Sequence, residues 1–340
     1  MARKGGWRRK GSKGRFRYYD ARGNRITDEA RLARIERLVI PPAWTDVWIS
    51  PNPRANLQAT GLDKAGRRQY LYHPDFRAQQ EQAKFDKLIR FADALPEFRM
   101  AMGEHMTLDV TERERVCAVA VRLINLAWFR VGSDEYAKRS RTYGVTTLYK
   151  KHVAVRGNKV AFTFRAKHKV LVRTTLVDTE LSGAIRELLA LDGGSRLFRY
   201  RKNGSDELVA LSGQVLNRYI QEHMGAEFTA KDFRTWGGTL TAAIALAERG
   251  PAETEAQARK AVAAVMRTVG DRLGNTPAVA RSSYVSPAVV EQYLDGRTIE
   301  DFRPPHLRVV RARDIGLDPE EQALVSLLRS WRIRRAQKAA

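Results

Sequence analysis

The sequence predicts an α+β fold, in which a small antiparallel β-sheet amino-terminal domain precedes a mainly α-helical domain with a three-stranded β-meander. Up to about residue 74, short alternating runs are separated by Pro and Gly, as is typical of strands and turns. Beyond about residue 85 the apolar residues recur at helical spacing, interrupted by three runs of period two between residues 146 and 176. A chain of 340 residues is long enough for two domains, which we place at residues 1–80 and 81–340.

Charge indicates the kind of partner. The chain has 61 Lys and Arg against 38 Asp and Glu, a formal net charge of +23, which predicts binding to a polyanion. The basic residues are spread along the chain rather than gathered on one amphipathic helix, so they favour nucleic acid over a membrane surface. The sequence contains neither an apolar run of the length that a membrane helix needs nor a signal-peptide core. We therefore expect a cytoplasmic, nucleoid-associated protein.

The metal-ligating residue types are sparse. Cys117 is the only cysteine and lies in an apolar stretch, so we expect a buried structural thiol, and neither an intrachain disulfide nor a cysteine-based zinc site can form. The six histidines are scattered along the chain. We predict no metal and no cofactor.

The first domain begins with a basic, Gly-containing segment over residues 1–15, which we expect to be a flexible arm. The alternating runs that follow predict a helix over residues 28–38 and strands over residues 16–19, 44–49, 55–60 and 69–72. Residues 75–85, charged and rich in Gln, are expected to connect the two domains.

The second domain opens on a capping-box pattern, Thr111 and Glu114, ahead of an apolar run to Phe129, and Ser133 can start the next helix. Period-two runs predict the meander over residues 146–155, 160–164 and 170–176, with Lys167 at the tip of its second hairpin. Helical periodicity, with Gly as the usual stop, predicts further helices over residues 179–191, 212–224, 231–249, 253–272 and 287–294, and a last one that starts at Asp318 and ends in the basic residues 332–338.

The segment from Leu273 to Pro287 contains Tyr284, the best candidate for a reacting atom. A phenol with a pKa of about 10 is a poor nucleophile at neutral pH unless cations stabilise the phenolate. Guanidiniums such as those of Arg130 and Arg234 are shaped to receive the charge that builds on phosphate oxygens during attack. A Lys on a hairpin tip, such as Lys167, can protonate a departing alkoxide, and Asn275 can donate an amide hydrogen bond.

Attack by Tyr284 on a phosphodiester would give a phosphotyrosine that retains the ester energy, so the strand can be rejoined without a nucleotide. The sequence has no Gly-x-x-x-x-Gly-Lys-Ser/Thr motif, which agrees with such a reversible nick. Taken singly, each candidate also has an ordinary structural explanation. Arg130 can be a helix-end charge, Lys167 an exposed hairpin residue, and Arg234 a side chain that packs its stem beside Trp236.

Taken together, these motifs resemble the type IB DNA topoisomerases of the compact bacterial and poxviral branch. The amino-terminal part of the resemblance covers Ile40–Trp48, Gln58–Gly61 and Arg68–Pro74, and the carboxy-terminal part covers Arg130–Gly132, Lys167, Lys231–Thr235, Leu273–Pro277 and Tyr284. By that resemblance, the helical domain is catalytic and Tyr284 forms a 3'-phosphotyrosyl bond. Arg130, Arg234 and Asn275 hold the scissile phosphate, and Lys167 with Arg130 protonates the departing 5'-oxygen.

The resemblance further implies relaxation of supercoiled duplex DNA, without ATP or metal, by a monomer that closes as a clamp. It assigns DNA contacts to Gln69, Tyr70, Tyr72, Gly132, Tyr136 and Lys231. Strand alternation places Tyr70 and Tyr72 on one face and Gln69 on the other. Two positions depart from the family pattern: poxviral members have His where this chain has Asn275, and the family commonly has Gly where this chain has Ala166.

Two other classes of protein fit part of the sequence. A tyrosine recombinase would use related Arg, Lys and Tyr chemistry, although such proteins generally carry a helical amino-terminal domain rather than a sheet. A non-catalytic basic DNA-binding protein would account for the charge alone. Relaxation of a single supercoiled plasmid would distinguish a topoisomerase from a recombinase. Covalent attachment of the protein to a nicked strand would distinguish it from a non-catalytic DNA-binding protein.

Overall fold

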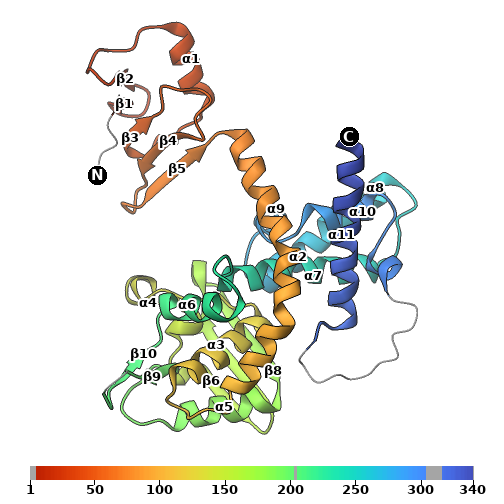
Figure 1. Ribbon diagram of the computed structural model, residues 1–340. Helices are drawn as coiled ribbons and strands as arrows, with labels where there is room; N and C mark the ends of the chain where they lie inside the picture. The colour runs from red at the N-terminus through yellow and green to blue at the C-terminus, as the bar shows by residue number, and fades with distance from the viewer. Residues whose placement is uncertain (1–4, 203–204, 304–315, 340) are drawn as a thin grey trace. The chain divides into compact units, whose positions relative to one another are not determined.

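The computed structural model describes residues 5–202, 205–303 and 316–339 (Figure 1). The chain forms two compact units that divide between Lys84 and Phe85. This division falls within helix α2 (Pro74–His105), so the connector expected over residues 75–85 is helical instead. The first unit is built on an antiparallel sheet, and the second is mainly helical with a three-stranded sheet, which confirms the α+β class. No helix in the described ranges is long and apolar enough to cross a membrane.

The first unit is a five-stranded antiparallel sheet with helix α1 (Glu29–Arg37), which Asp28 caps by accepting from the backbone N–H of Arg31. The spatial order of the strands is β2 (Arg17–Tyr19), β1 (Trp7–Lys10), β3 (Thr45–Ile49), β4 (Leu57–Leu62) and β5 (Arg68–Tyr72). One apolar cluster fills its interior, formed by Trp7, Ile26, Ile35, Val47, Ile49 and Ala59. The unit therefore has a core of its own.

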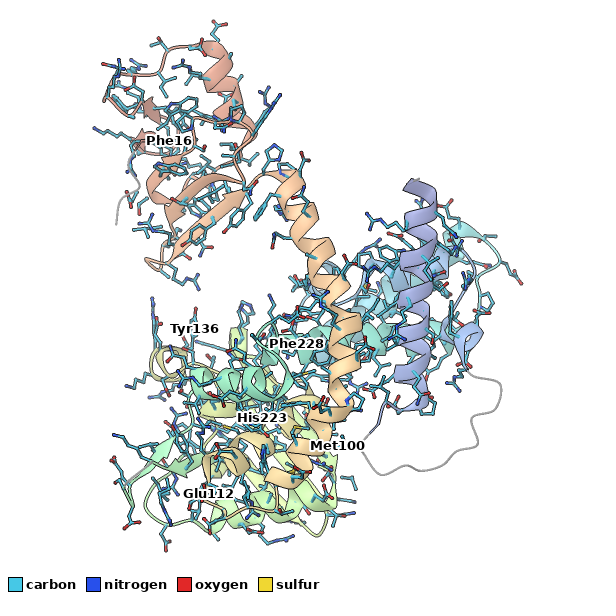
Figure 2. All side chains as sticks on the ribbon, in the orientation of Figure 1. Phe16, Met100, Glu112, Tyr136, His223 and Phe228 are labelled. Atoms are coloured by element: carbon cyan, nitrogen blue, oxygen red, sulfur yellow. The ribbon has the colours of Figure 1, made fainter. Side chains whose placement is uncertain are left out.

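Strand β1 corrects the expectation of a flexible arm over residues 1–15. Trp7 is buried and pairs with Ile49 of β3, so residues 7–10 of this basic segment are part of the sheet, while residues 1–4 lie outside the described residues. The Arg9 guanidinium lies 4.1 Å from the centre of the Phe16 ring (labelled in Figure 2) and donates to three backbone carbonyls, those of Ile40, Pro41 and Trp44. This run of Arg and Lys can form a strand because Trp7 packs in the apolar core and Arg9 donates hydrogen bonds to loop carbonyls.

The second unit places helix α7 (Ala230–Ala247) at its centre, buried along most of its length. Around it lie α2 from Phe85 onward, α3 (Arg113–Ala127), α6 (Gly213–Met224), α8 (Glu255–Leu273), α10 (Pro287–Leu294) and α11 (Pro319–Ala339). The short helices α4 (Asp134–Ser140) and α9 (Pro277–Ser283), helix α5 (Thr179–Ala190) and the hairpin of β9 (Arg199–Arg201) and β10 (Leu208–Ala210) complete it. Phe91, Phe233 and Trp236 pack ring against ring in the core. Cys117 is buried on α3, as expected.

The meander consists of β6 (Val153–Arg156), β7 (Lys159–Arg165) and β8 (Leu171–Val177), in that spatial order. Its first strand is shorter than expected, because residues 145–147 and 150–152 form 3₁₀ turns. The backbone N–H groups of Val145 and Thr146 donate to the carbonyls of Arg130 and Val131, so this segment pairs with the chain that follows α3. The alternation of polar and apolar residues within this segment does not reveal such hydrogen bonds to a distant part of the chain.

The capping box expected at Thr111 and Glu114 is absent. Glu112 is the N-cap residue of α3 and makes no side-chain capping bond. The Thr111 hydroxyl donates instead to the Asp109 carboxylate at 2.6 Å, and Glu114 accepts from Arg113. The helix therefore begins one residue later than the pattern indicated, and Asp109 rather than Thr111 organises the preceding turn.

Trp7→Ala is expected to destabilise the first unit by about 3 kcal/mol, because it empties the largest side chain of a small core. Hydrogen exchange of the β3 and β4 backbone amides in the full chain measures this. Lys13→Ala, a change at an exposed residue of the same basic segment, serves as the control and should leave exchange unchanged. Equal exchange in Trp7→Ala and the parent would show that β1 is not part of the folded sheet.

Candidate active site

Arg234 lies on α7, on the same face as Gly237 and Gly238, at helical spacings of three and four residues. Its side chain is almost fully buried, with 5% of the residue exposed. The two terminal nitrogens donate to backbone carbonyls, one to Trp128 and the other to Leu273 at 2.9 Å. The Nε is buried, and no described residue accepts a hydrogen bond from it. Burial lowers the pKa of Arg234 to about 10, yet the guanidinium remains charged at neutral pH.

Arg130 follows the end of α3, where Trp128 takes a left-handed conformation with φ of 52° and turns the chain. Its carbonyl accepts from the N–H of Val145 at 2.8 Å, which fixes its backbone. The close packing of these two segments requires glycine at position 144, because a Cβ on Gly144 would lie 2.4 Å from the Arg130 carbonyl oxygen. The Arg130 side chain donates to the carbonyl of Gly274 at 3.0 Å and to Oδ1 of Asn275 at 2.7 Å.

Each guanidinium has a backbone acceptor in the carboxy-terminal turn of α8, Leu273 for Arg234 and Gly274 for Arg130. Leu273 is the last residue of that helix, and Gly274 caps it with φ of 61°, a conformation that glycine adopts without strain. The N–H of Asn275 donates back to the carbonyl of Gly270 at 2.8 Å, which holds the reversed chain in place. The last carbonyls of a helix lack partners within it and carry partial negative charge, so they are natural acceptors for cations.

Tyr284 directly follows the short helix α9, which the sequence prediction missed. Thr276 caps α9 and Pro277 occupies its first turn, a signal that could have identified it. The half-buried phenol ring faces Arg234, whose guanidinium carbon lies 5.2 Å from the ring centre. The Tyr284 carbonyl accepts from the Thr239 hydroxyl at 3.1 Å, and a Cβ on Gly238 would lie 2.8 Å from that same oxygen. Gly238 thus lets Tyr284 approach α7 closely.

Two opposing effects set the pKa of Tyr284. Burial raises it, but the positive charges of Arg234, Arg130 and Lys231 outweigh burial and hold the pKa below its ordinary value. Among these cations Arg234 acts most strongly and Lys231 least. The site therefore stabilises the phenolate, which is the nucleophilic form, relative to that of an ordinary tyrosine.

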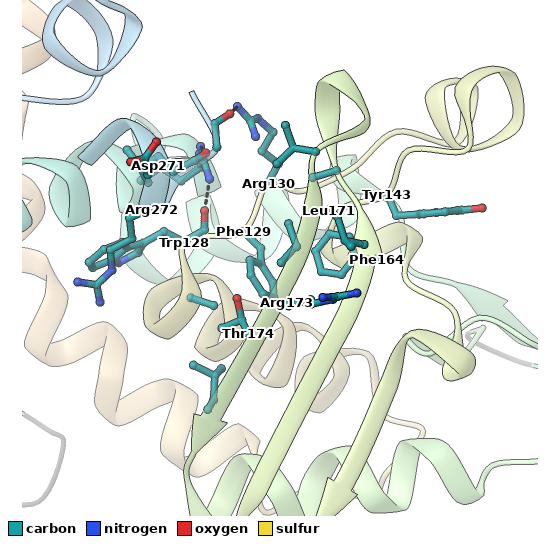
Figure 3. A pocket seen from close by; sticks show the side chains of 18 of the residues that line it. Trp128, Phe129, Arg130, Tyr143, Phe164, Leu171, Arg173, Thr174, Asp271 and Arg272 are labelled. Carbon is teal, nitrogen blue, oxygen red and sulfur yellow. Dashed lines mark hydrogen bonds between the residues drawn. The ribbon is translucent and has the colours of Figure 1, made fainter. Parts of the chain in front are cut away.

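Four of the five candidates expected for catalysis come together here, namely Tyr284, Arg234, Arg130 and Asn275. The fifth, Lys167, is exposed in the 3₁₀ turn between β7 and β8 and thus at the hairpin tip, as predicted. Near this turn the chain borders a pocket of about 490 Å³, lined by the end of α3, strand β8 and the end of α8 (Figure 3). Its lining includes both Arg130 and Arg234.

The residues expected to contact DNA fall into separate places. On β5, Tyr70 and Tyr72 share the exposed face, 47% and 42% exposed, and their rings stack with centroids 6.2 Å apart. Gln69 lies on the opposite face, as strand alternation predicts, and donates to Asp63 at 2.9 Å.

In the second unit, Tyr136 is 42% exposed on α4 (Figure 2), and Lys231 is exposed in the first turn of α7. Gly132 packs against Gly144 and Thr147, and because it has no side chain it lets these two chain segments approach closely. Across the described part of the chain, no group of three or more His, Cys, Asp and Glu side chains is placed to hold a metal ion.

A tyrosine whose phenol faces one guanidinium and lies within reach of the charge of a second, in a chain with a large positive charge, is typical of enzymes that transfer phosphodiesters through a covalent tyrosine intermediate. The family model described as the catalytic core of eukaryotic DNA topoisomerase I matches residues 73–301. A second model, the bacterial DNA topoisomerase IB amino-terminal domain, matches residues 15–63.

Curated relatives agree with both family models. DNA topoisomerase 1B of Acanthamoeba polyphaga mimivirus is 31% identical over 285 residues, which cover 82% of this chain and 84% of that protein. DNA topoisomerase 1 of rabbit fibroma virus is 26% identical over 281 residues, with 79% and 84% covered. DNA topoisomerase 1B of vaccinia virus (strain Copenhagen) is 22% identical over 269 residues, with 77% and 81% covered. The chain belongs to the type IB DNA topoisomerase family, and the resemblance seen in the sequence motifs is confirmed.

Gly238→Ala is expected to destabilise the protein by about 1–3 kcal/mol, because the added methyl group has no room between α7 and Tyr284. Gly183→Ala is the matched control, since it adds the same methyl group within helix α5 where no atom lies within 4 Å. There the change should stabilise by about 1 kcal/mol through helix propensity. Thermal unfolding measures both; equal shifts in the two variants would contradict the close approach of Tyr284 to α7.

Proposed function

We propose that this protein relaxes supercoiled duplex DNA by cutting one strand transiently, letting the free end swivel and rejoining it, without ATP or metal. The observation that carries the proposal is the packing of the Tyr284 phenol against the Arg234 guanidinium, within reach of the charge of Arg130. The family supports this activity, and the geometry supports the choice of nucleophile. We further propose that the protein acts as a monomer that closes as a clamp around the duplex.

In the proposed reaction, the Tyr284 oxygen attacks phosphorus, a tyrosine–phosphorus bond forms, and the bond from phosphorus to the 5'-oxygen breaks. The result is a 3'-phosphotyrosyl intermediate and a free 5'-hydroxyl. Arg234 is suited to hold the phosphate, because its buried Nε has an N–H group that no described residue uses. A phosphate oxygen would satisfy that donor and receive a charge-assisted hydrogen bond.

Binding of a phosphate requires a local exchange of partners at Asn275. In this structure its Nδ2 donates to the carbonyl of Leu273 at 3.2 Å, and its Oδ1 accepts from Arg130. A phosphate can compete for both the Asn275 amide and the Arg130 guanidinium, since an anion is a stronger acceptor than a neutral oxygen. Asn275 and Arg130 would then hold the phosphate together with Arg234.

The departing 5'-oxygen needs a proton, and we propose that Lys167 supplies it with help from Arg130. Lys167 is exposed on the β7–β8 turn, whose neighbours Ala166 and Val170 line the pocket that Arg130 and Arg234 also line, so a phosphate bound there could receive its ammonium group. Two residues of the turn, His168 and Lys169, have φ of 62° and 61°, left-handed conformations that ordinary residues rarely hold. Relief of that strain would accompany a change in the turn.

Tyr284→Phe is expected to abolish relaxation, because it removes the attacking oxygen while leaving the ring and its packing. The test is relaxation of supercoiled plasmid in EDTA without ATP, with DNA binding measured in parallel. The parent should relax plasmid, and the variant should bind DNA without relaxing it. Relaxation by both proteins would exclude Tyr284 as the nucleophile, and defined exchange products between two duplexes would instead favour a recombinase.

Arg234→Gln is expected to move the rise of the cleavage rate with pH towards alkaline values. The Arg234 charge lowers the pKa of Tyr284, so its removal raises that pKa and delays phenolate formation to higher pH. Lys231→Gln should shift the profile in the same direction but less, because Lys231 acts more weakly on the phenol. Single-turnover cleavage of an oligonucleotide from neutral to alkaline pH gives the profiles; unchanged profiles in both variants would contradict the electrostatic account.

A further inference from the structure

A stacked pair, Arg272 on Trp128, lies at one end of the pocket beside the candidate site (Figure 3). The guanidinium carbon of Arg272 is 4.1 Å from the centre of the Trp128 ring, a close cation–π contact. In the described part of the chain, no carboxylate pairs with Arg272, and burial lowers its pKa. The stacking is therefore the principal interaction that the folded chain offers to this side chain.

Trp128 is fixed on its other side by α7. A Cβ on Gly237 would lie 2.2 Å from the indole ring, so the ring rests directly on the backbone of that helix. The residue has φ of 52°, and its carbonyl accepts a hydrogen bond from Arg234. A movement of the Trp128 ring would therefore move an acceptor that holds the buried guanidinium.

Arg272 belongs to the turn that supplies the other acceptors. It immediately precedes Leu273, whose carbonyl accepts from Arg234, and Gly274, whose carbonyl accepts from Arg130. The Trp128–Arg272 pair thus joins the end of α3 to the end of α8. Every backbone carbonyl that the two guanidiniums use lies at one of these two helix ends.

We propose that Arg272 and Trp128 are positioning residues of the reaction, which act by holding the acceptors of Arg234 and Arg130 in register with Tyr284. The inference rests on the proposed function and extends it to two residues outside the attacking and phosphate-holding set. Arg272 orients the site through Trp128 and the α8 turn, and loss of the stack loosens both guanidiniums together.

The main competing explanation is that Arg272 is an ordinary phosphate contact, whose loss weakens DNA binding without altering the chemistry. A second stacked pair in the chain provides a control for it. The Arg335 guanidinium lies 5.1 Å from the centre of the Trp331 ring on α11, and Arg335 is exposed. Arg335→Met removes the same charge and a similar stacking contact at a place that holds no candidate residue.

The experiment compares the parent, Arg272→Met, Arg272→Lys, Trp128→Phe and Arg335→Met in single-turnover cleavage at saturating DNA, with DNA affinity and the pH profile measured for each. Arg272→Met is expected to cleave about tenfold more slowly than Arg335→Met at similar affinity, because guanidiniums that are misplaced by a fraction of an ångström stabilise the transition state less. Arg272→Lys should recover part of the rate, since an ammonium can also lie over the ring.

Two further results are expected. The pH profile of Arg272→Met should move to higher pH, because a displaced Arg234 lowers the pKa of Tyr284 less. Combining Arg272→Met with Trp128→Phe should slow cleavage less than the two single losses multiplied together, because both changes weaken the same contact.

Equal cleavage rates in Arg272→Met and Arg335→Met would overturn the inference, as would a loss confined to DNA affinity with an unchanged pH profile. The parent protein separates this failure from failure of the proposed function. If the parent relaxes plasmid and these variants match the control, only the positioning role is wrong. A parent that does not relax plasmid would overturn the proposed function and this inference together.

Discussion

The hydrogen bonds from two guanidiniums to the carboxy-terminal turn of α8 are the interaction on which the site depends. Arg234 reaches this turn from the central helix α7, and Arg130 reaches it from the segment after α3. Because the last carbonyls of a helix lack partners within it, they can accept these donors while α8 remains intact. Two like charges are thereby held beside one phenol, and unsatisfied carbonyls offset part of their mutual repulsion.

The central helix α7 makes this arrangement possible because it has no side chains at the two positions where its neighbours approach most closely. Gly237 receives the Trp128 ring and Gly238 receives the backbone of Tyr284, so neighbouring glycines serve two different contacts. On another side of α7, the Trp236 indole donates to the carboxylate of Glu321, which also forms a bidentate ion pair with Arg99. This buried network joins α2, α7 and α11, and the loss of Glu321 would leave the Trp236 donor without its acceptor and the Arg99 charge without its carboxylate.

Sequence reasoning recovered the fold class and most long helices, because these leave strong local signals. Its motifs also named four candidate catalytic residues that the structure brings together, namely Tyr284, Arg234, Arg130 and Asn275. Helix α10 lies where its proline and periodicity placed it, over Pro287–Leu294. Sequence reasoning failed where a contact with a distant part of the chain decides the local conformation. The sequence of β1 resembles a basic arm, and only the pairing of Trp7 with Ile49 shows that it is a strand. Residues 146–147 were predicted as strand, but the hydrogen bonds of this segment to the chain after α3 give it another conformation. The sequence motifs named Arg234 and Tyr284, but not the glycines that let them meet.

The central claim is that Tyr284 is the residue that becomes joined to DNA, and mass spectrometry of the covalent adduct tests it most directly. The protein is trapped on nicked DNA by denaturation, digested with trypsin and nuclease, and the modified peptide is fragmented. Cleavage after Arg281 and Arg297 gives a peptide with two tyrosines, Tyr284 and Tyr293, and the latter is buried and donates to the carbonyl of Gly250. We expect the nucleotide on Tyr284, joined through a 3'-phosphate. Its presence on Tyr293 or on another residue, or the absence of any adduct from a protein that relaxes DNA, would contradict the account.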